Sequence, residues 1–395
     1  MKKLNWIPKS LIVFAFIFPF LSFSETLNSG SFEVLPYLIK KNKDQVHLRF
    51  QQKNSQKLFF KNNSSNLIEV KTKKKELTTL SPFYQKCGHP LKISLSDDRE
   101  NPVYKRTLKA FPCDPEKAFS FVFISDTQKH HEKHNKMAKL LLDRIKDRPI
   151  NFIINGGDIV QDGSVEKNWT SFLSASVPYS QMFPIVPIIG NHDYWGNVYD
   201  DPIDDANAVF TPKLFNKYLG LEEDNEYGYY SLDYPQFKLI VLNSNFPKLP
   251  AKVISQQMEW TKKELQKSKE KKQPVIISFH HAPFTSNIFY YGPVAISFRN
   301  KWIPLFEESG VVKLILNGHS HLYERSLKDG IMYVVAGPFG GSKNWLPKMN
   351  NHYRLAIHAE KDTFSLFKVT NTTIEMETFD QTNQLIDSFS IDLEI

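Results

Sequence analysis

The pattern of hydrophobic and polar positions divides the chain into two regions. Between residues 25 and 115 short stretches alternate polar and apolar side chains, as residues 45–50 do, and turns rich in Asn, Ser and Lys separate them. This pattern predicts half-buried strands of a small β-sandwich. From Ala118 onward, apolar runs of strand length alternate with helical spacings, which predicts an α/β region. We therefore expect a β-sandwich domain over residues 25–115 and a catalytic α/β domain over residues 116–395, joined by a linker at residues 111–115.

Individual elements of the second region follow from the same pattern. Buried strands are predicted at residues 119–124, 151–154, 185–189, 237–242, 275–279, 311–316 and 331–335, and the tail after residue 353 is again strand-rich. Met137, Leu141 and Ile145 mark one amphipathic helix, and Met258 and Leu265 lie on the apolar face of another. His130, His131 and His134 are interpreted as the polar start of the first helix.

The first 24 residues resemble an export signal. Lys2, Lys3 and Lys9 precede an apolar run over residues 11–23, which is short for a membrane span. Small residues predict cleavage after Ser24, so we expect a periplasmic or secreted protein. An uncleaved membrane anchor is the alternative, and no later stretch is apolar enough to span a membrane.

Charge and cysteine content exclude some functions. The formal charge is +8, and removal of three signal lysines leaves 8 − 3 = +5. The basic residues form no groove interleaved with aromatic residues, so we expect no nucleic-acid binding but a mild attraction for anionic substrates. Cys87 and Cys113 are too few for a structural zinc site, and an exported chain could join them in a disulfide or keep two thiols.

Five polar clusters follow five of the apolar strands. They lie at residues 125–128, 156–163, 190–193, 280–283 and 318–321. The carboxyl ends of strands in one α/β sheet can meet at a single rim. The clusters offer carboxylate, amide and imidazole ligands and no thiolate, which suits hard-to-borderline divalent metals. Their number suits two ions about 3.5–4 Å apart that share one carboxylate.

Three of these clusters carry a family resemblance. Residues 157–158 (GD), 190–193 (GNHD) and 318–321 (GHSH) resemble the motifs of calcineurin-like metallophosphoesterases, in the family's order. Residues 318–325 (GHSHLYER) resemble the purple acid phosphatase branch more closely, as do residues 35–38 and 334–338. The resemblance implies an α/β/β/α sandwich preceded by a fibronectin III-like β-sandwich. It also implies a phosphatase that uses two divalent metal ions, iron, manganese or zinc, and attacks phosphate monoesters with a metal-bound hydroxide.

The resemblance also implies roles for single residues. The first ion would be held by Asp126 and His321, the second by Asn191, His280 and His319, and both by the bridging Asp158. His192 would contact a phosphoryl oxygen or protonate the leaving group. In the adjacent pair of histidines, His281 remains the alternative to His280. Asp162 and Asp193 are interpreted as turn or supporting residues.

Two positions depart from the family pattern. Gln128 stands where the family often has histidine, and its amide oxygen could be a weaker metal ligand or reach the site through water. Gln161 stands where purple acid phosphatases have the tyrosine that gives them colour by charge transfer to iron. We therefore expect a colourless enzyme without a preference for Fe(III).

The sequence leaves the substrate open. A phosphorylated small molecule is expected, and a phosphodiesterase or nucleotidase could use the same site. A non-catalytic binding protein of the same fold is a further alternative. Aromatic residues near the clusters could line a cleft or pack in the core: Tyr194, Trp195, Tyr290, Tyr291 and Trp345.

Overall fold

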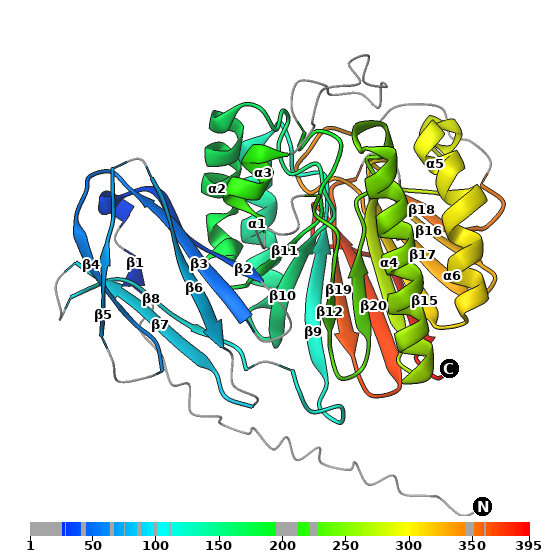
Figure 1. Ribbon diagram of the computed structural model, residues 1–395, viewed down its shortest axis with the longest axis horizontal. Coiled ribbons are helices and arrows are strands. Elements are labelled where there is room, and N and C mark those ends of the chain that lie inside the picture. The colour runs from blue at the N-terminus through cyan, green and yellow to red at the C-terminus, as the bar shows by residue number, and fades with distance from the viewer. Residues whose placement is uncertain are drawn as a thin grey trace, which may run out of the picture.

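The protein is a layered assembly of two β-sheets and two helical layers with a β-sandwich at one end (Figure 1). The computed structural model describes residues 26–27, 29–40, 45–63, 67–74, 76–84, 88–97, 101–110, 112–194, 212–220, 227–343, 351–358 and 361–395. The proposed export signal at residues 1–24 lies outside these ranges. Among the described residues, no helix has both the length and the apolar character that a membrane crossing requires.

The N-terminal region is the predicted small β-sandwich. One of its sheets has the order β1 (Thr26–Leu27), β8 (Pro102–Leu108), β7 (Leu91–Ser96), β4 (Lys57–Lys61) and β5 (Ile68–Lys71). The strands β2 (Phe32–Lys40), β3 (Gln45–Gln52) and β6 (Leu77–Tyr84) face it, after a short helix η1 (Ser29–Ser31). Buried side chains from both sheets, such as Phe50, Phe60 and Leu95, form one core between them.

The sandwich sheet made of β2, β3 and β6 continues into the α/β region. Strand β2 pairs in parallel with β11 (Ile185–Pro187), where Ile185 lies opposite Ile39. A sheet of nine strands results, in the order β21-β20-β19-β9-β10-β11-β2-β3-β6. Its other members are β9 (Phe119–Ile124), β10 (Ile150–Asn155), β19 (Thr363–Val369), β20 (Thr373–Asp380) and β21 (Leu385–Asp392).

The second sheet of the α/β region packs face to face against the first. Its order is β12 (Tyr230–Asp233), β13 (Lys238–Val241), β14 (Val275–His281), β15 (Val312–Gly318), β17 (Ile331–Val335), β16 (Tyr323–Lys328) and β18 (Arg354–His358). Phe121 and Phe152 from the first sheet and Leu239 and Leu316 from the second lie in the core between them. Strands buried on both faces read as continuous apolar runs, which is why the sequence pattern predicts them well.

Helices cover the outer face of each sheet (Figure 1). The helices α1 (His131–Ile145), α2 (Glu166–Ser180) and α3 (Lys213–Tyr218) share a core with the first sheet. The second sheet is covered by α4 (Ala251–Glu270), α5 (Pro293–Ser297), α6 (Ile303–Ser309) and the π-helical turn η4 (Phe298–Trp302). Two short 3-10 helices, η2 (Phe246–Lys248) and η3 (Ile288–Tyr291), lie in the connections. The expected α/β/β/α sandwich is therefore confirmed.

The structure contradicts one expectation about α1 and decides one about the cysteines. Met137, Leu141 and Ile145 face the core as predicted, but His134 is also fully buried, so the interpretation of the three histidines as a polar helix start is wrong for it. The reason is that Phe172, Tyr179 and Phe339 surround its ring. Cys113 is disulfide-bonded, and Cys87 lies outside the described residues.

Candidate metal centre

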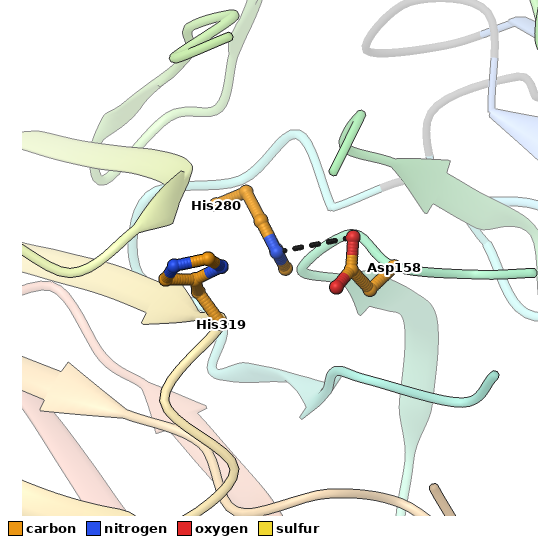
Figure 2. A group of neighbouring side chains, drawn as sticks. All are labelled: Asp158, His280 and His319. Carbon is orange, nitrogen blue, oxygen red and sulfur yellow. Dashed lines mark ion pairs between the residues drawn. The ribbon is translucent and has the colours of Figure 1, made fainter. Parts of the chain in front are cut away.

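The polar clusters meet where parallel strands of the two sheets end. Strands β9, β10 and β11 are parallel in the first sheet, and β14 and β15 are parallel in the second. Two groups of side chains have ligand atoms within 4.8 Å of one another: Asp158, His280 and His319 form one, and Asp126, Asp158 and His321 form the other. Figure 2 shows the first group, with the imidazole of His280 directed at the Asp158 carboxylate. Asp158 belongs to both groups.

The backbone at four of these residues adopts an unusual conformation. Positive φ angles of 53°, 50°, 70° and 51° occur at Asp126, Asp158, His319 and His321. Such left-handed conformations cost non-glycine residues about 1–3 kcal/mol each and concentrate at functional sites. The surrounding structure therefore holds these four side chains in place against a local backbone preference.

Close packing explains two glycines of the motifs. A Cβ atom at Gly190 would lie 2.2 Å from Asp158 Oδ1, and one at Gly318 would lie 2.7 Å from Asp126 Oδ2. Both distances are far below van der Waals contact. Any side chain at these positions would push the two carboxylates out of the site.

Asp126 anchors one side of the centre. Its carboxylate accepts the backbone N–H of His319 at 3.1 and 3.2 Å, and His321 Nε2 lies 3.4 Å from its Oδ1. Burial lowers the pKa of His321, but the Asp126 carboxylate outweighs that effect and raises it. Gln128 is buried beside this pair, with Nε2 3.1 Å from His321 Nε2 and 3.3 Å from Asp158 Oδ2.

His280 is held in the ring orientation that a metal ligand needs. Its Nδ1 lies 2.9 Å from the carbonyl oxygen of Gly156, so Nδ1–H donates there and Nε2 faces Asp158 Oδ1 at 3.2 Å. Among the described residues, the buried Nε2 has no hydrogen-bond partner. Burial lowers the pKa of His280, but the Asp158 charge raises it to about 10. The geometry thus favours a cation between this nitrogen and Asp158.

The charge of Asp158 is stabilised by the same surroundings. Burial raises its pKa, but the imidazoles of His280 and His192 outweigh burial and hold the pKa well below the usual range. A buried carboxylate that stays ionised and belongs to both ligand groups suits a shared ligand of two cations. Carboxylate and imidazole donors with an orphaned ring nitrogen therefore fit the divalent ions that the motifs imply.

Asn191 and His192 complete the cluster. Asn191 Oδ1 lies 3.1 Å from His319 Nδ1, and the backbone N–H of His192 donates to Asp158 Oδ1 at 2.9 Å. His192 Nδ1 lies 2.8 Å from the carbonyl oxygen of Gln161, and its Nε2 lies 3.9 Å from Asp158 Oδ2. The His192 side chain is 18% exposed. It therefore presents Nε2 at the border between the centre and solvent.

The structure separates the two neighbouring histidines of β14. His281 Nδ1 lies 2.7 Å from Ser244 Oγ, whereas His280 belongs to the metal group. Asp193 and Asp162 contact backbone and hydroxyl groups and belong to neither group. Asp162 accepts from Ser164, and Asp193 accepts three backbone N–H groups.

Several contacts near the centre were not predicted from the sequence. Lys248 is buried, and its Nζ donates to the carbonyl oxygen of Asn191 at 2.9 Å. The Phe289 ring lies 4.3 Å from the His319 ring, measured between centroids. Glu324 accepts the N–H and Oγ–H of Ser286 at 2.6 and 2.7 Å. These contacts depend on tertiary structure, so residue spacing could not reveal them.

The aromatic residues named from the sequence differ in position. Tyr194 is buried and accepts a hydrogen bond from Asn243, so it packs in the interior. Arg299 stacks on Tyr290 at 3.8 Å, and Tyr291 is 60% exposed. Trp195 and Trp345 lie outside the described residues.

Comparison with known proteins identifies the family. A family model described as calcineurin-like phosphoesterase matches residues 119–323, more than half of the sequence. The chain therefore belongs to the calcineurin-like phosphoesterase family, whose members are metal-dependent phosphoric ester hydrolases as a class. A search of curated proteins finds no match.

Solved structures extend the likeness to the whole fold. A purple acid phosphatase, PPD1 from yellow lupin (Lupinus luteus) seeds, is 16% identical with a TM-score of 0.71 over 90% of this chain and 74% of that chain. PhoD is 11% identical with a TM-score of 0.68 over 92% and 94%. GAP50, the anchor in the inner membrane complex of Plasmodium, is 18% identical with a TM-score of 0.55 over 70% and 90%. At these identities the likeness establishes the fold, and it includes the purple acid phosphatase branch that residues 318–325 resemble.

Proposed function

We propose that the chain is an exported dinuclear metallophosphatase that hydrolyses phosphate monoesters of small molecules. The observation that carries the proposal is the position of Asp158 in both ligand groups. Asp126 and His321 would hold the first ion, with Gln128 beside it, and Asn191, His280 and His319 would hold the second. The two divalent ions would be iron, manganese or zinc, because the donors are oxygen and imidazole nitrogen.

The remaining assignments of the proposal come from the sequence. Residues 1–24 would direct export and be removed, so the enzyme would act in the periplasm or outside the cell. Residues 25–115 would form the accessory domain, which we expect to be fibronectin III-like, and residues 116–395 the catalytic domain. With Gln161 beside His192 in place of a tyrosine, the metal-loaded enzyme is expected to be colourless.

The chain's own residues would orient the substrate and move a proton. When bound, a pair of divalent ions lowers the pKa of water towards neutrality and neutralises charge on the phosphate. Asp158 keeps its negative charge because the imidazoles around it lower its pKa. The backbone carbonyl oxygen of Gln161 accepts the Nδ1–H of His192. Nε2 of His192 is therefore the atom that would bind a phosphoryl oxygen or protonate the leaving alcohol.

Loss of the shared carboxylate tests the proposal. Asp158→Ala should abolish hydrolysis of p-nitrophenyl phosphate and remove both ions from the purified protein, while the circular dichroism spectrum stays unchanged. Asp143→Ala is the control, because Asp143 is exposed on α1, forms an ion pair with Lys146 at the end of the same helix, and belongs to neither ligand group. Full activity of Asp158→Ala, or a wild-type protein without metal after incubation with each candidate ion, would refute the proposal.

The choice of substrate class needs a separate measurement. Rates on p-nitrophenyl phosphate and bis-p-nitrophenyl phosphate compare a monoester with a diester that has the same leaving group. We expect a higher kcat/KM on the monoester. A higher value on the diester would replace the monoesterase assignment by a phosphodiesterase that uses the same centre.

A further inference from the structure

The side chain of Gln128 lies in the wall of the first ligand group. It is 1% exposed, and its Nε2 lies within 3.3 Å of two ligand atoms, Asp158 Oδ2 and His321 Nε2. Both of these residues belong to the group that also contains Asp126. The end of the Gln128 side chain is therefore as close to this group as its members are to one another.

The other end of the same amide is unsatisfied. Gln128 Oε1 is buried and has no hydrogen-bond partner among the residues that the structure describes. A buried carbonyl oxygen without a partner is rare in folded proteins. The oxygen and the nitrogen of a glutamine amide have nearly the same shape, and the terminal torsion that exchanges them is soft.

We infer that the amide oxygen of Gln128 is a direct ligand of the first ion, an assignment that rests on the proposed function. Without a cation, the amide N–H groups face the Asp158 carboxylate and the imidazole of His321. A cation at this place repels N–H donors and attracts a carbonyl oxygen. A half-turn of the amide would bring the orphaned oxygen to the cation and turn the N–H groups away from it.

This assignment makes the two metal sites chemically different. The first site would have three oxygen donors, from Asp126, Asp158 and Gln128, and one imidazole from His321. The second would have two oxygen donors and two imidazoles, from Asp158, Asn191, His280 and His319. Oxygen-rich sites suit hard divalent ions such as Mn²⁺, and imidazole suits Zn²⁺ and similar ions. Gln128 would therefore give the first site a stronger preference for Mn²⁺ over Zn²⁺ than the second site has.

Metal binding tests the role of Gln128 without an activity assay. The full-length protein is titrated with Mn²⁺ and followed by isothermal calorimetry and by the spin-coupled electron paramagnetic resonance signal of an Mn²⁺ pair. The variants are Gln128→Leu, which removes the amide, and Gln128→Glu, which keeps an oxygen at the same reach. Gln266→Leu is the matched control, because Gln266 is exposed on α4 and contacts Glu270 there.

The expected result is a selective loss. Gln128→Leu should bind one Mn²⁺ as wild type does and the other at least about tenfold more weakly, with loss of the coupled signal at limiting Mn²⁺. Gln128→Glu should restore both, and Gln266→Leu should match wild type. Two equally tight ions in Gln128→Leu would overturn the assignment of Gln128 and leave the proposed function intact. A wild-type protein that binds no ion would instead overturn the proposed function itself.

Discussion

Asp193 accepts the backbone N–H of Gly190 at 2.8 Å through one carboxylate oxygen, and this contact closes the loop that carries Asn191 and His192. Its other oxygen accepts the N–H groups of Ile159 and Val160 at 2.9 and 3.1 Å. One buried side chain thus ties the loop after β11 to the loop after β10. It fixes the distance between Asp158 and Asn191 although it belongs to neither ligand group.

Asp193→Asn tests this tie. An amide has one acceptor where the carboxylate has two, so at least one of the three N–H groups must face an NH₂ group. We expect the affinity for metal and kcat to fall about 10–100-fold, as for other residues that support ligands. Calorimetric titration with Mn²⁺ and rates on p-nitrophenyl phosphate measure both. The control is Asp162→Asn, because the Asp162 carboxylate accepts hydrogen bonds from Ser164 of the same turn. An equal loss in both variants would argue against the tie.

His192→Ala distinguishes the two roles proposed for this imidazole. A general acid contributes about 10²–10⁴-fold to rate, and it matters most for leaving groups of high pKa. We expect His192→Ala to bind two ions, to lose about 10²–10⁴-fold in kcat on an alkyl phosphate, and to lose much less on p-nitrophenyl phosphate. An equal loss on both esters would assign His192 to contact with the phosphoryl oxygen alone.

The sequence predicts the elements that carry the centre better than it predicts their supports. Strand β9 coincides with the predicted run because its six residues are all buried and apolar or small. The candidate ligands were predictable because each lies at or soon after the end of such a strand and carries a donor that metals prefer. The partners of Lys248 and Glu324 were not predictable, because a charged residue acquires its partner only through the tertiary fold.

The shared sheet was beyond prediction for a similar reason. Strand β11 has three residues, and its pairing with β2 depends on a single opposed pair, Ile185 and Ile39. An apolar strand at the edge of a domain and one in its centre have the same pattern of residues. The boundary at residue 115 therefore stays a prediction, while the sheet runs across it.

The shared sheet predicts that the two regions unfold together. Arg49 on β3 donates to the carbonyl oxygens of Tyr218 and Gly220, both at 2.7 Å, and so binds the sandwich to the end of α3. Hydrogen bonds from charged donors contribute about 1.5–3 kcal/mol each. We expect one cooperative thermal transition and, for the two bonds together, a loss of about 3–6 kcal/mol in Arg49→Leu, measured by urea unfolding. Lys57→Leu on the exposed outer sheet should change little, and two separate transitions in the wild type would contradict the prediction.

The buried His134 predicts a loss of stability in acid. Burial lowers its pKa from 6.5 to about 3, with a smaller effect from His131, and its Nε2 lies 3.0 Å from the hydroxyl of Tyr179. The unfolded chain therefore binds this proton more readily than the folded chain does. The contribution of neutral His134 is complete above pH 6.5 and is lost as the pH falls towards 3, by about 1.4 kcal/mol for each pH unit.

His134→Gln should flatten this dependence, because a glutamine can keep a hydrogen bond to Tyr179 and does not titrate. The measurement is the free energy of unfolding in urea at pH 4.5, 5.5, 6.5 and 7.5, with wild type and variant compared at each pH. His130→Gln is the matched control, since His130 is exposed one residue before α1 and should leave the wild-type slope unchanged. Equal slopes in His134→Gln and wild type would show that other groups, such as the carboxylates of the metal centre, account for the whole acid sensitivity.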